Sequence, residues 1–182
     1  MIRKNVNALL AVLLLIAAVL ACSSGNETEK ANKLVEQGNN AVNEAKKSMT
    51  EAEELKAKML KTDVSQLAEA RATAKEDVAA LDKAEDKCKE AASKYDEASR
   101  LKLNDKFKEY LSLKTKEYNK RVELIETSKG LPQALIDSES REGWIKKANE
   151  VTDKVNKIAK EADDLGAQAD KLQKDNPDIF KS

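Results

Sequence analysis

Apolar and small residues recur along most of this chain at alternating spacings of three and four positions. The first run of them is Ala31, Leu34, Gly38, Ala41, Ala45, Ser48, Ala52, Leu55 and Met59. Residues at this spacing share one face of a helix, and such a seam packs against a second helix along its length. The interval 39–129 contains neither Gly nor Pro. The sequence therefore predicts an all-α chain of long helices that pack side by side.

A second seam covers 67–125 and a third covers 144–172. Between the first two seams, Asp63 and Gln66 have the spacing of a capping box, which predicts a turn at Lys61–Val64. The expected fold is an elongated antiparallel helical bundle, or coiled coil, of three long helices. In its first half, the second seam consists of Leu67, Arg71, Ala74, Val78, Leu81, Glu85, Cys88, Ala92, Tyr95 and Ser99.

The second seam contains one irregularity. From Ala92 to Leu111 its spacing reads 3-4-4-4-4, an inserted stutter that locally unwinds a supercoil without breaking the helix. On this interpretation the second helix is continuous over about 65–128. The alternative is a break at 103–105, where Asn104 or Asp105 would cap an additional helix, and the bundle would then contain four helices.

The clearest helix end lies at Gly130 and Pro132. Gly suits a left-handed residue that ends a helix, and Pro suits the first turn of the next one. Asn176 and Pro177 end the third seam. We therefore expect the bundle to cover 30–176 and residues 177–182 to be frayed.

The N-terminus has the pattern of an export signal. Arg3 and Lys4 precede an uncharged apolar run of 14 residues, Ala8–Ala21. At about 1.5 Å per residue the run covers roughly 21 Å, which is short for a bilayer core of about 30 Å. The pattern favours a cleaved signal peptide over residues 1–21, and the alternative is a short uncleaved anchor.

The end of this run, Val19-Leu20-Ala21-Cys22, resembles the lipobox of bacterial lipoproteins. The resemblance implies that the lipoprotein signal peptidase cuts before Cys22 and that Cys22 becomes an acylated N-terminus, carrying chains such as palmitate. Two or three acyl chains are enough for stable membrane anchoring. Ser23 after the cysteine, where Asp would favour the inner membrane, implies the outer membrane facing the periplasm. Residues 22–29 would then form an acylated cysteine and a short polar tether.

Composition limits the function of the mature chain. Without residues 1–21 it has 31 basic and 33 acidic residues, which argues against a nucleic-acid partner because such proteins carry a strongly basic face. The whole chain contains no histidine, the commonest general base and metal ligand. We find no catalytic motif and expect no enzymatic activity, no cofactor and no metal. Acid–base pairs four residues apart, such as Glu117–Arg121, predict a soluble helical exterior.

Aromatic side chains are few, at 3% of the chain, and they offer the candidate surface for a partner. Phe107, Tyr110 and Tyr118 lie close together in the second seam, and Trp144 opens the third. If they are exposed, they form a possible interaction surface, because aromatic residues are favoured at binding hot spots. The alternative is that they pack in the core. Cys88, on the second seam, is expected to be a buried and unreactive thiol, and the alternative is a thiol that reacts or pairs with another molecule.

These observations favour a lipid-anchored protein of the bacterial cell envelope. Its helical bundle would act as a structural or protein-interaction module, with a protein partner or a second copy bound through the helical seams. The alternative function is the handling of lipid or another apolar ligand by amphipathic helices. The narrow, alanine-rich seams and the faces that are not selectively basic argue against this alternative.

Overall fold

The computed structural model describes residues 25–62, 66–138 and 141–180. They form the helices α1 (Gly25–Lys61), α2 (Leu67–Ser99), α3 (Asp105–Ser128), α4 (Gly130–Asp137) and α5 (Arg141–Asp175), and a short 3-10 helix, η3 (Pro177–Ile179). No strand occurs in this part of the chain, and the all-α prediction is confirmed. The predicted signal peptide, 1–21, and the predicted acylation site, Cys22, lie outside the described residues. Among the described helices, none has the length and apolarity needed to cross a bilayer.

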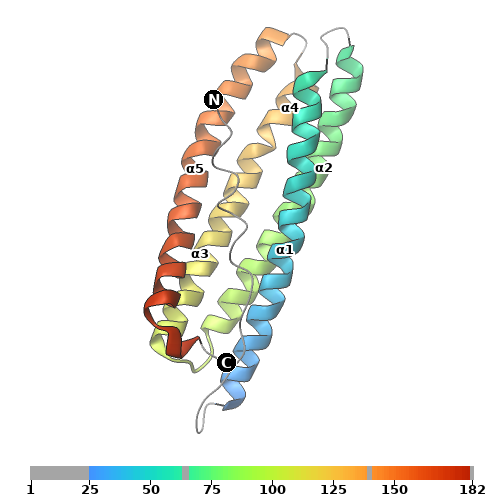
Figure 1. The fold of residues 1–182 in the computed structure, drawn as a ribbon. Helices are drawn as coiled ribbons and strands as arrows, with labels where there is room; N and C mark the ends of the chain where they lie inside the picture. Colours follow the sequence, from blue (N-terminus) through green and yellow to red (C-terminus); the bar gives the residue numbers. More distant parts are fainter. Residues whose placement is uncertain (1–24, 63–65, 139–140, 181–182) are drawn as a thin grey trace.

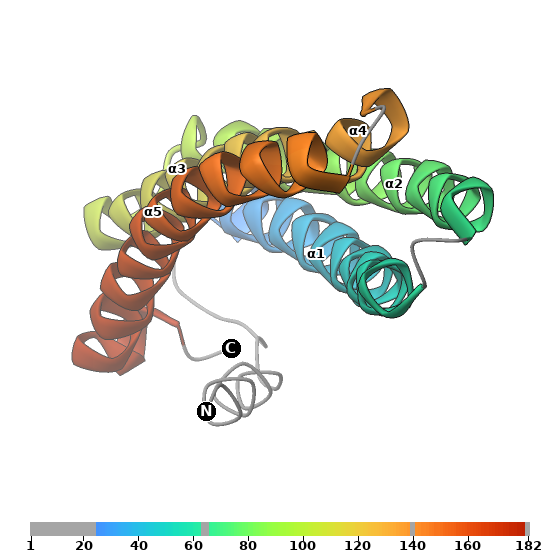
Figure 2. The ribbon, with the colours of Figure 1, turned by 90° about the horizontal axis from the view of Figure 1, so that it is seen from above.

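The four long helices form an elongated bundle in which each is antiparallel to the next (Figure 1). α1 packs along α2, α2 along α3, and α3 along α5, while the short α4 packs between α2 and α5. Seen from above, the helices follow a bent row with α1 and α5 on its two outer sides (Figure 2). With 37 residues at 1.5 Å each, α1 alone is about 55 Å long.

The prediction of one continuous helix over 65–128 was wrong, and the alternative with a break near Asn104 is confirmed. α2 ends at Ser99 and α3 begins at Asp105. Asn104 has extended backbone with ψ of 140°, and its side-chain oxygen accepts a hydrogen bond of 2.8 Å from the backbone N–H of Lys106. Asn is among the best residues for this capping role. The break lets α3 fold back along α2, so that both helices bury their apolar faces.

The predicted turn between the first two helices is confirmed, because α1 ends at Lys61 and α2 begins at Leu67. The left-handed helix end predicted at Gly130 was wrong. Gly130 is the first residue of α4, and Lys129 before it has helical dihedral angles, φ −58° and ψ −23°. Pro132 lies in the first turn of α4, as predicted. Because Pro has no N–H to continue the hydrogen bonds of α3, the chain bends here into a new helix.

The bundle begins earlier than predicted. α1 starts at Gly25, so the tether predicted over 22–29 is shorter and the bundle does not start at residue 30. Glu27 in the first turn suits the positive end of the helix dipole. Glu29 forms an ion pair of 2.8 Å with Lys33 one turn later. Polar residues without Gly or Pro after position 25 therefore continue the helix toward the N-terminus.

The frayed C-terminus predicted over 177–182 was wrong for residues 177–180, and residues 181–182 lie outside the described part. Pro177–Ile179 form η3, which returns the chain toward the bundle. Ile179 and Phe180 are half-buried and pack against the main core. The apolar area that Phe180 removes from water stabilises this short segment.

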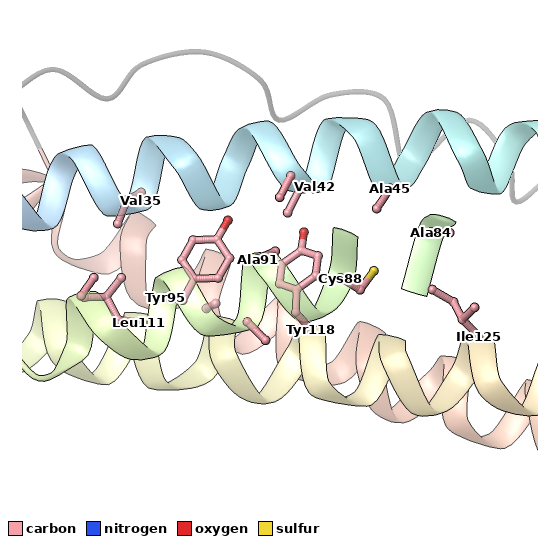
Figure 3. Close-up of a cluster of buried hydrophobic side chains, with 14 of the residues drawn as sticks. Val35, Val42, Ala45, Ala84, Cys88, Ala91, Tyr95, Leu111, Tyr118 and Ile125 are labelled. Atoms are coloured by element: carbon pink, nitrogen blue, oxygen red, sulfur yellow. The ribbon is translucent and has the colours of Figure 1, made fainter. Parts of the chain in front are cut away.

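The main core is built largely from small side chains, which allow the helices to approach closely. Figure 3 shows Tyr95 of α2 and Tyr118 of α3 directed toward α1 among them. Gly38 of α1 lies against the ring of Tyr95, and a Cβ atom at Gly38 would be 3.1 Å from Cε1 and Cζ of that ring. The buried alanines of α1 and α2 in this core are Ala31, Ala41, Ala45, Ala52, Ala80, Ala84, Ala91, Ala92 and Ala98.

Replacing the cap residue should weaken the bundle at the break between α2 and α3. We expect Asn104→Ala to lower the free energy of unfolding by about 1 kcal/mol, because the N–H groups that begin α3 lose their side-chain acceptor. Asn119→Ala, at an exposed position inside α3, is the matched control and should be neutral or slightly stabilising. Urea unfolding of both variants measures the difference, and equal effects would contradict the capping role.

Candidate functional site

The structure divides the candidate aromatic residues into two groups. Phe107, Tyr110 and Tyr118 belong to the main core, and none of them is more than 9% exposed. Trp144 lies at the opposite end of the bundle, half-buried against a second cluster. The proposed interaction surface was therefore wrong for Phe107, Tyr110 and Tyr118, because α3 folds back onto α2 and encloses them. The second cluster consists of Met59, Ala70, Ala74 and Leu135.

Three aromatic rings close the core at the end where α3 begins. The ring of Phe180 meets Phe107 edge-on, with centroids 5.6 Å apart, and Tyr110 with centroids 5.0 Å apart. Phe107 and Tyr110 are themselves 6.4 Å apart. Edge-to-face pairs at these distances stabilise beyond the area that they bury. Burial raises the pKa of Tyr110, so its hydroxyl stays protonated.

Tyr95 and Tyr118 form the aromatic contact in the middle of the bundle, with ring centroids 5.6 Å apart. The hydroxyl of Tyr95 donates a hydrogen bond of 2.6 Å to Oδ1 of Asn39 and so ties α2 to α1. Lys114 Nζ lies 5.0 Å from the centroid of the Tyr118 ring, within the range of a cation–π contact. Burial raises the pKa of both tyrosines, which excludes a tyrosinate at neutral pH. These rings therefore serve packing.

A buried carboxylate joins α3 to α5. Glu117 was expected on the exterior, but its side chain is only 4% exposed. Its Oε2 accepts a hydrogen bond of 2.6 Å from Lys114 Nζ, and its Oε1 lies 2.9 Å from Nη2 of Arg121. Arg121 also reaches Asp163 of α5 at 3.3 Å. A Cβ atom at Gly166 of α5 would lie 3.2 Å from the carboxylate, so this glycine makes room for the charge.

A second buried carboxylate, Glu85, lies where α2 meets the junction of α3 and α4. It accepts hydrogen bonds from Lys89 on its own helix and from Lys129 at the junction. Lys129 also pairs with Asp82. Burial alone would raise the pKa of Glu85, but the hydrogen bonds from Lys129 and Lys89 outweigh it and hold the pKa below its usual range. The group is thus a fixed anion that ties the junction to α2.

Asp77 is a buried carboxyl of a different kind. Its residue is 2% exposed, and in the described part of the chain no cation lies within ion-pair distance of it. Burial raises its pKa from 3.8 to about 6, and the more distant charge of Lys56 on α1 partly opposes this rise. Asp77 therefore changes its charge just below neutral pH.

Cys88 is a free thiol buried between α2 and its neighbours, as predicted. Burial raises its pKa to about 11. Nucleophilic attack and metal binding require the thiolate, so this cysteine is unreactive in the folded protein.

The described surface holds few features that could bind a small ligand. An open depression between α3 and α5 is lined by both carboxylate and ammonium groups. Within the described ranges, no group of three Cys, Asp or Glu side chains could hold a metal ion. Across the described surface, the large apolar side chains that are exposed are Leu60 (59%) and Ile145 (41%). They lie near the ends of α1 and α5 that are farthest from Gly25. The depression is lined by Glu123, Thr127, Lys154, Lys157, Ile158 and Glu161.

Comparison of the chain with protein-family models, with curated proteins and with solved structures gave no match.

Placing a charge at position 110 tests whether Tyr110 belongs to the core or to an interaction surface. We expect Tyr110→Glu to lower the free energy of unfolding by at least about 3 kcal/mol, because it places an unpaired carboxylate among the rings of Phe107 and Phe180. Tyr110→Phe keeps the ring and should cost much less. Thermal unfolding tests both variants, and a Tyr110→Glu protein that is as stable as Tyr110→Phe would contradict the burial of this ring.

Removing the ionisable group at Asp77 should stabilise the protein in a pH-dependent manner. The raised pKa means that the folded state holds the proton more tightly than the unfolded chain, so stability is lost as pH rises from about 4 through 6. We therefore expect Asp77→Asn to gain about 1–3 kcal/mol at pH 7 and little below pH 4. Urea unfolding at both pH values measures this gain. Asp86→Asn, exposed on the same helix, is the control, and a similar gain in that variant would contradict the prediction.

Proposed function

We propose that this protein is a lipid-anchored component of a bacterial cell envelope whose helical bundle acts as a structural or protein-interaction module without catalytic activity. The observation that carries the proposal is Cys22, placed directly after Val19-Leu20-Ala21 at the end of an apolar run of 14 residues. This arrangement resembles a lipoprotein signal. Acyl chains on Cys22 would attach the mature chain to a membrane, and Ser23 favours the outer membrane.

The packing of the bundle supports a structural role. Three pairs of neighbouring long helices pack along their length, the buried alanines of the main core lie on α1, α2 and α5, and buried charged groups tie α3 to its neighbours. Glu117 and Arg121 join α3 to α5, while Glu85 and Lys129 join α2 to the α3–α4 junction. A bundle fixed at several points along its length suits a spacer or a docking platform better than a container that must open.

The buried polar groups also support a role without catalysis. A catalytic acid, base or nucleophile must reach a substrate. Here Glu85 and Glu117 are enclosed and neutralised by neighbouring cations, and Cys88 is a protonated thiol within the core. Because the apolar seams are used between the helices, the proposed contact with a protein partner or a second copy falls on side chains outside them.

Mutation of the proposed acylation site tests the anchor. In a bacterial host, Cys22→Ala should accumulate as a larger, uncleaved precursor and should not incorporate labelled palmitate. Cys88→Ala is the matched control, because it removes the other cysteine and should be processed and labelled normally. Normal maturation and labelling of the Cys22→Ala variant would contradict the proposal that Cys22 is acylated.

The alternative function, handling of lipid or another apolar ligand, predicts a different result. Residues 23–182 without acyl chains should neither bind phospholipid vesicles nor increase the fluorescence of an apolar dye if the bundle is a structural module. Binding of either probe by this fragment would favour the alternative.

A further inference from the structure

The first helix begins very close to the proposed anchor. Three residue steps separate Cys22 from Gly25, where α1 starts. At 3.8 Å between successive Cα atoms, these steps span at most about 11 Å. If the sulfur of Cys22 carries acyl chains, as the proposed function states, the first turn of α1 is therefore held near the membrane surface.

Two other segments lie at the same end of the bundle as Gly25. They are the connection between α2 and α3 and the C-terminal segment that contains η3 (Figure 1). Leu101 and Leu103 come from the first segment, and Ile179 and Phe180 come from the second. All four side chains are half-buried, with one side packed against the main core. We call these four residues the basal face.

We propose that the basal face rests on the bilayer that holds the acyl chains of Cys22, so that the bundle stands away from the membrane. The proposal depends on the acylation proposed above. The basal face would contact the interfacial layer of a phospholipid bilayer, a region that accommodates Leu and Phe side chains. The short link brings the bilayer to this end of the bundle, and the half-buried side chains give the contact an apolar component.

The charges at this end of the bundle predict little preference between neutral and anionic lipid headgroups. Arg100 forms an ion pair with Asp96, and Lys106 forms one of 2.7 Å with Glu109, so both are already neutralised within the protein. Basic and acidic groups are mixed, which gives little net attraction to anionic headgroups. We therefore expect the same seating on phosphatidylcholine as on phosphatidylglycerol. Charged residues near this end, on the described helix ends and in the segments beside them, include Glu27, Glu29, Lys30, Arg100, Lys102, Asp105, Lys106, Lys174, Asp175 and Asp178.

A natural fluorescent reporter lies at the end of the bundle opposite the basal face. Its single tryptophan, Trp144, lies near the start of α5, at the far end of the bundle from Gly25. The length of α1, about 55 Å, approximates the distance between the two ends. A contact quencher confined to the acyl chains of the bilayer cannot reach an indole at that distance.

The experiment uses the full acylated protein in vesicles of phosphatidylcholine with brominated acyl chains, which quench tryptophan on contact. We expect no quenching of Trp144. In a Trp144→Phe background, we expect quenching for Leu103→Trp and for Phe180→Trp. Leu60→Trp in the same background is the matched control at the far end and should not be quenched. The two basal variants are independent reporters, so the test survives misfolding of either one.

A second variant tests the role of the short link. A flexible Gly-Ser linker between Ser24 and Gly25 should leave vesicle binding unchanged and abolish the quenching of Leu103→Trp. Persistent quenching would overturn the role that we assign to this link.

The possible failures are distinguishable. A vesicle-bound protein whose far-end tryptophans are quenched as strongly as the basal ones lies flat, which would overturn only the present proposal. A bound protein without basal quenching would do the same. Failure of the purified protein to carry acyl chains or to bind vesicles would overturn the proposed anchor as well.

Discussion

The close approach of neighbouring helices is the constraint on which the rest of this structure depends. It requires small residues where two helices meet, and alanine makes up half of the buried residues of the main core. Gly38 against the Tyr95 ring and Gly166 against the Glu117 carboxylate are two such close approaches. Each glycine faces a large side chain from the neighbouring helix, so the two side chains fix the register of α1 on α2 and of α5 on α3. Because tight packing leaves few voids, a polar group enclosed at these contacts must find a partner within the bundle. This requirement explains why Tyr95 meets Asn39 and why Glu117 meets two cations.

Helix periodicity was sufficient to predict the fold class and much of the burial, but it did not predict the whole buried face of α2. Six residues of the predicted seam are buried: Ala74, Leu81, Glu85, Cys88, Ala92 and Tyr95. Val78 on that seam is only half-buried, whereas Asp77 beside it is buried, which a pattern based on apolar residues excludes. The buried face is wider than one seam because α2 packs against both α1 and α3. Its other members are Ala70, Thr73, Asp77, Ala80, Ala84, Ala91 and Ala98.

The break between α2 and α3 marks another limit of local sequence patterns. The cap at Asn104 was recognisable as an alternative, yet nothing local required the helix to end there. The decisive term is the apolar area that α3 buries by folding back, a property of the whole bundle. The folding back of α3 also encloses Phe107, Tyr110 and Tyr118. The wrong prediction of a continuous helix over 65–128 therefore led to a wrong prediction of the interaction surface. The proposed lipidation signal at Cys22 is independent of these packing terms.

The order of the helices in the bundle has a consequence for how the protein acquires its structure. Every extensive contact between long helices joins elements that follow one another along the chain: α1 with α2, α2 with α3, and α3 with α5. Chains dominated by such local contacts have low contact order, and helical proteins of this kind fold in microseconds to milliseconds. A polypeptide that is synthesised from its N-terminus can therefore form the α1–α2 hairpin before α5 has appeared. Sequential completion would shorten the time during which its apolar seams are exposed to other unfolded chains.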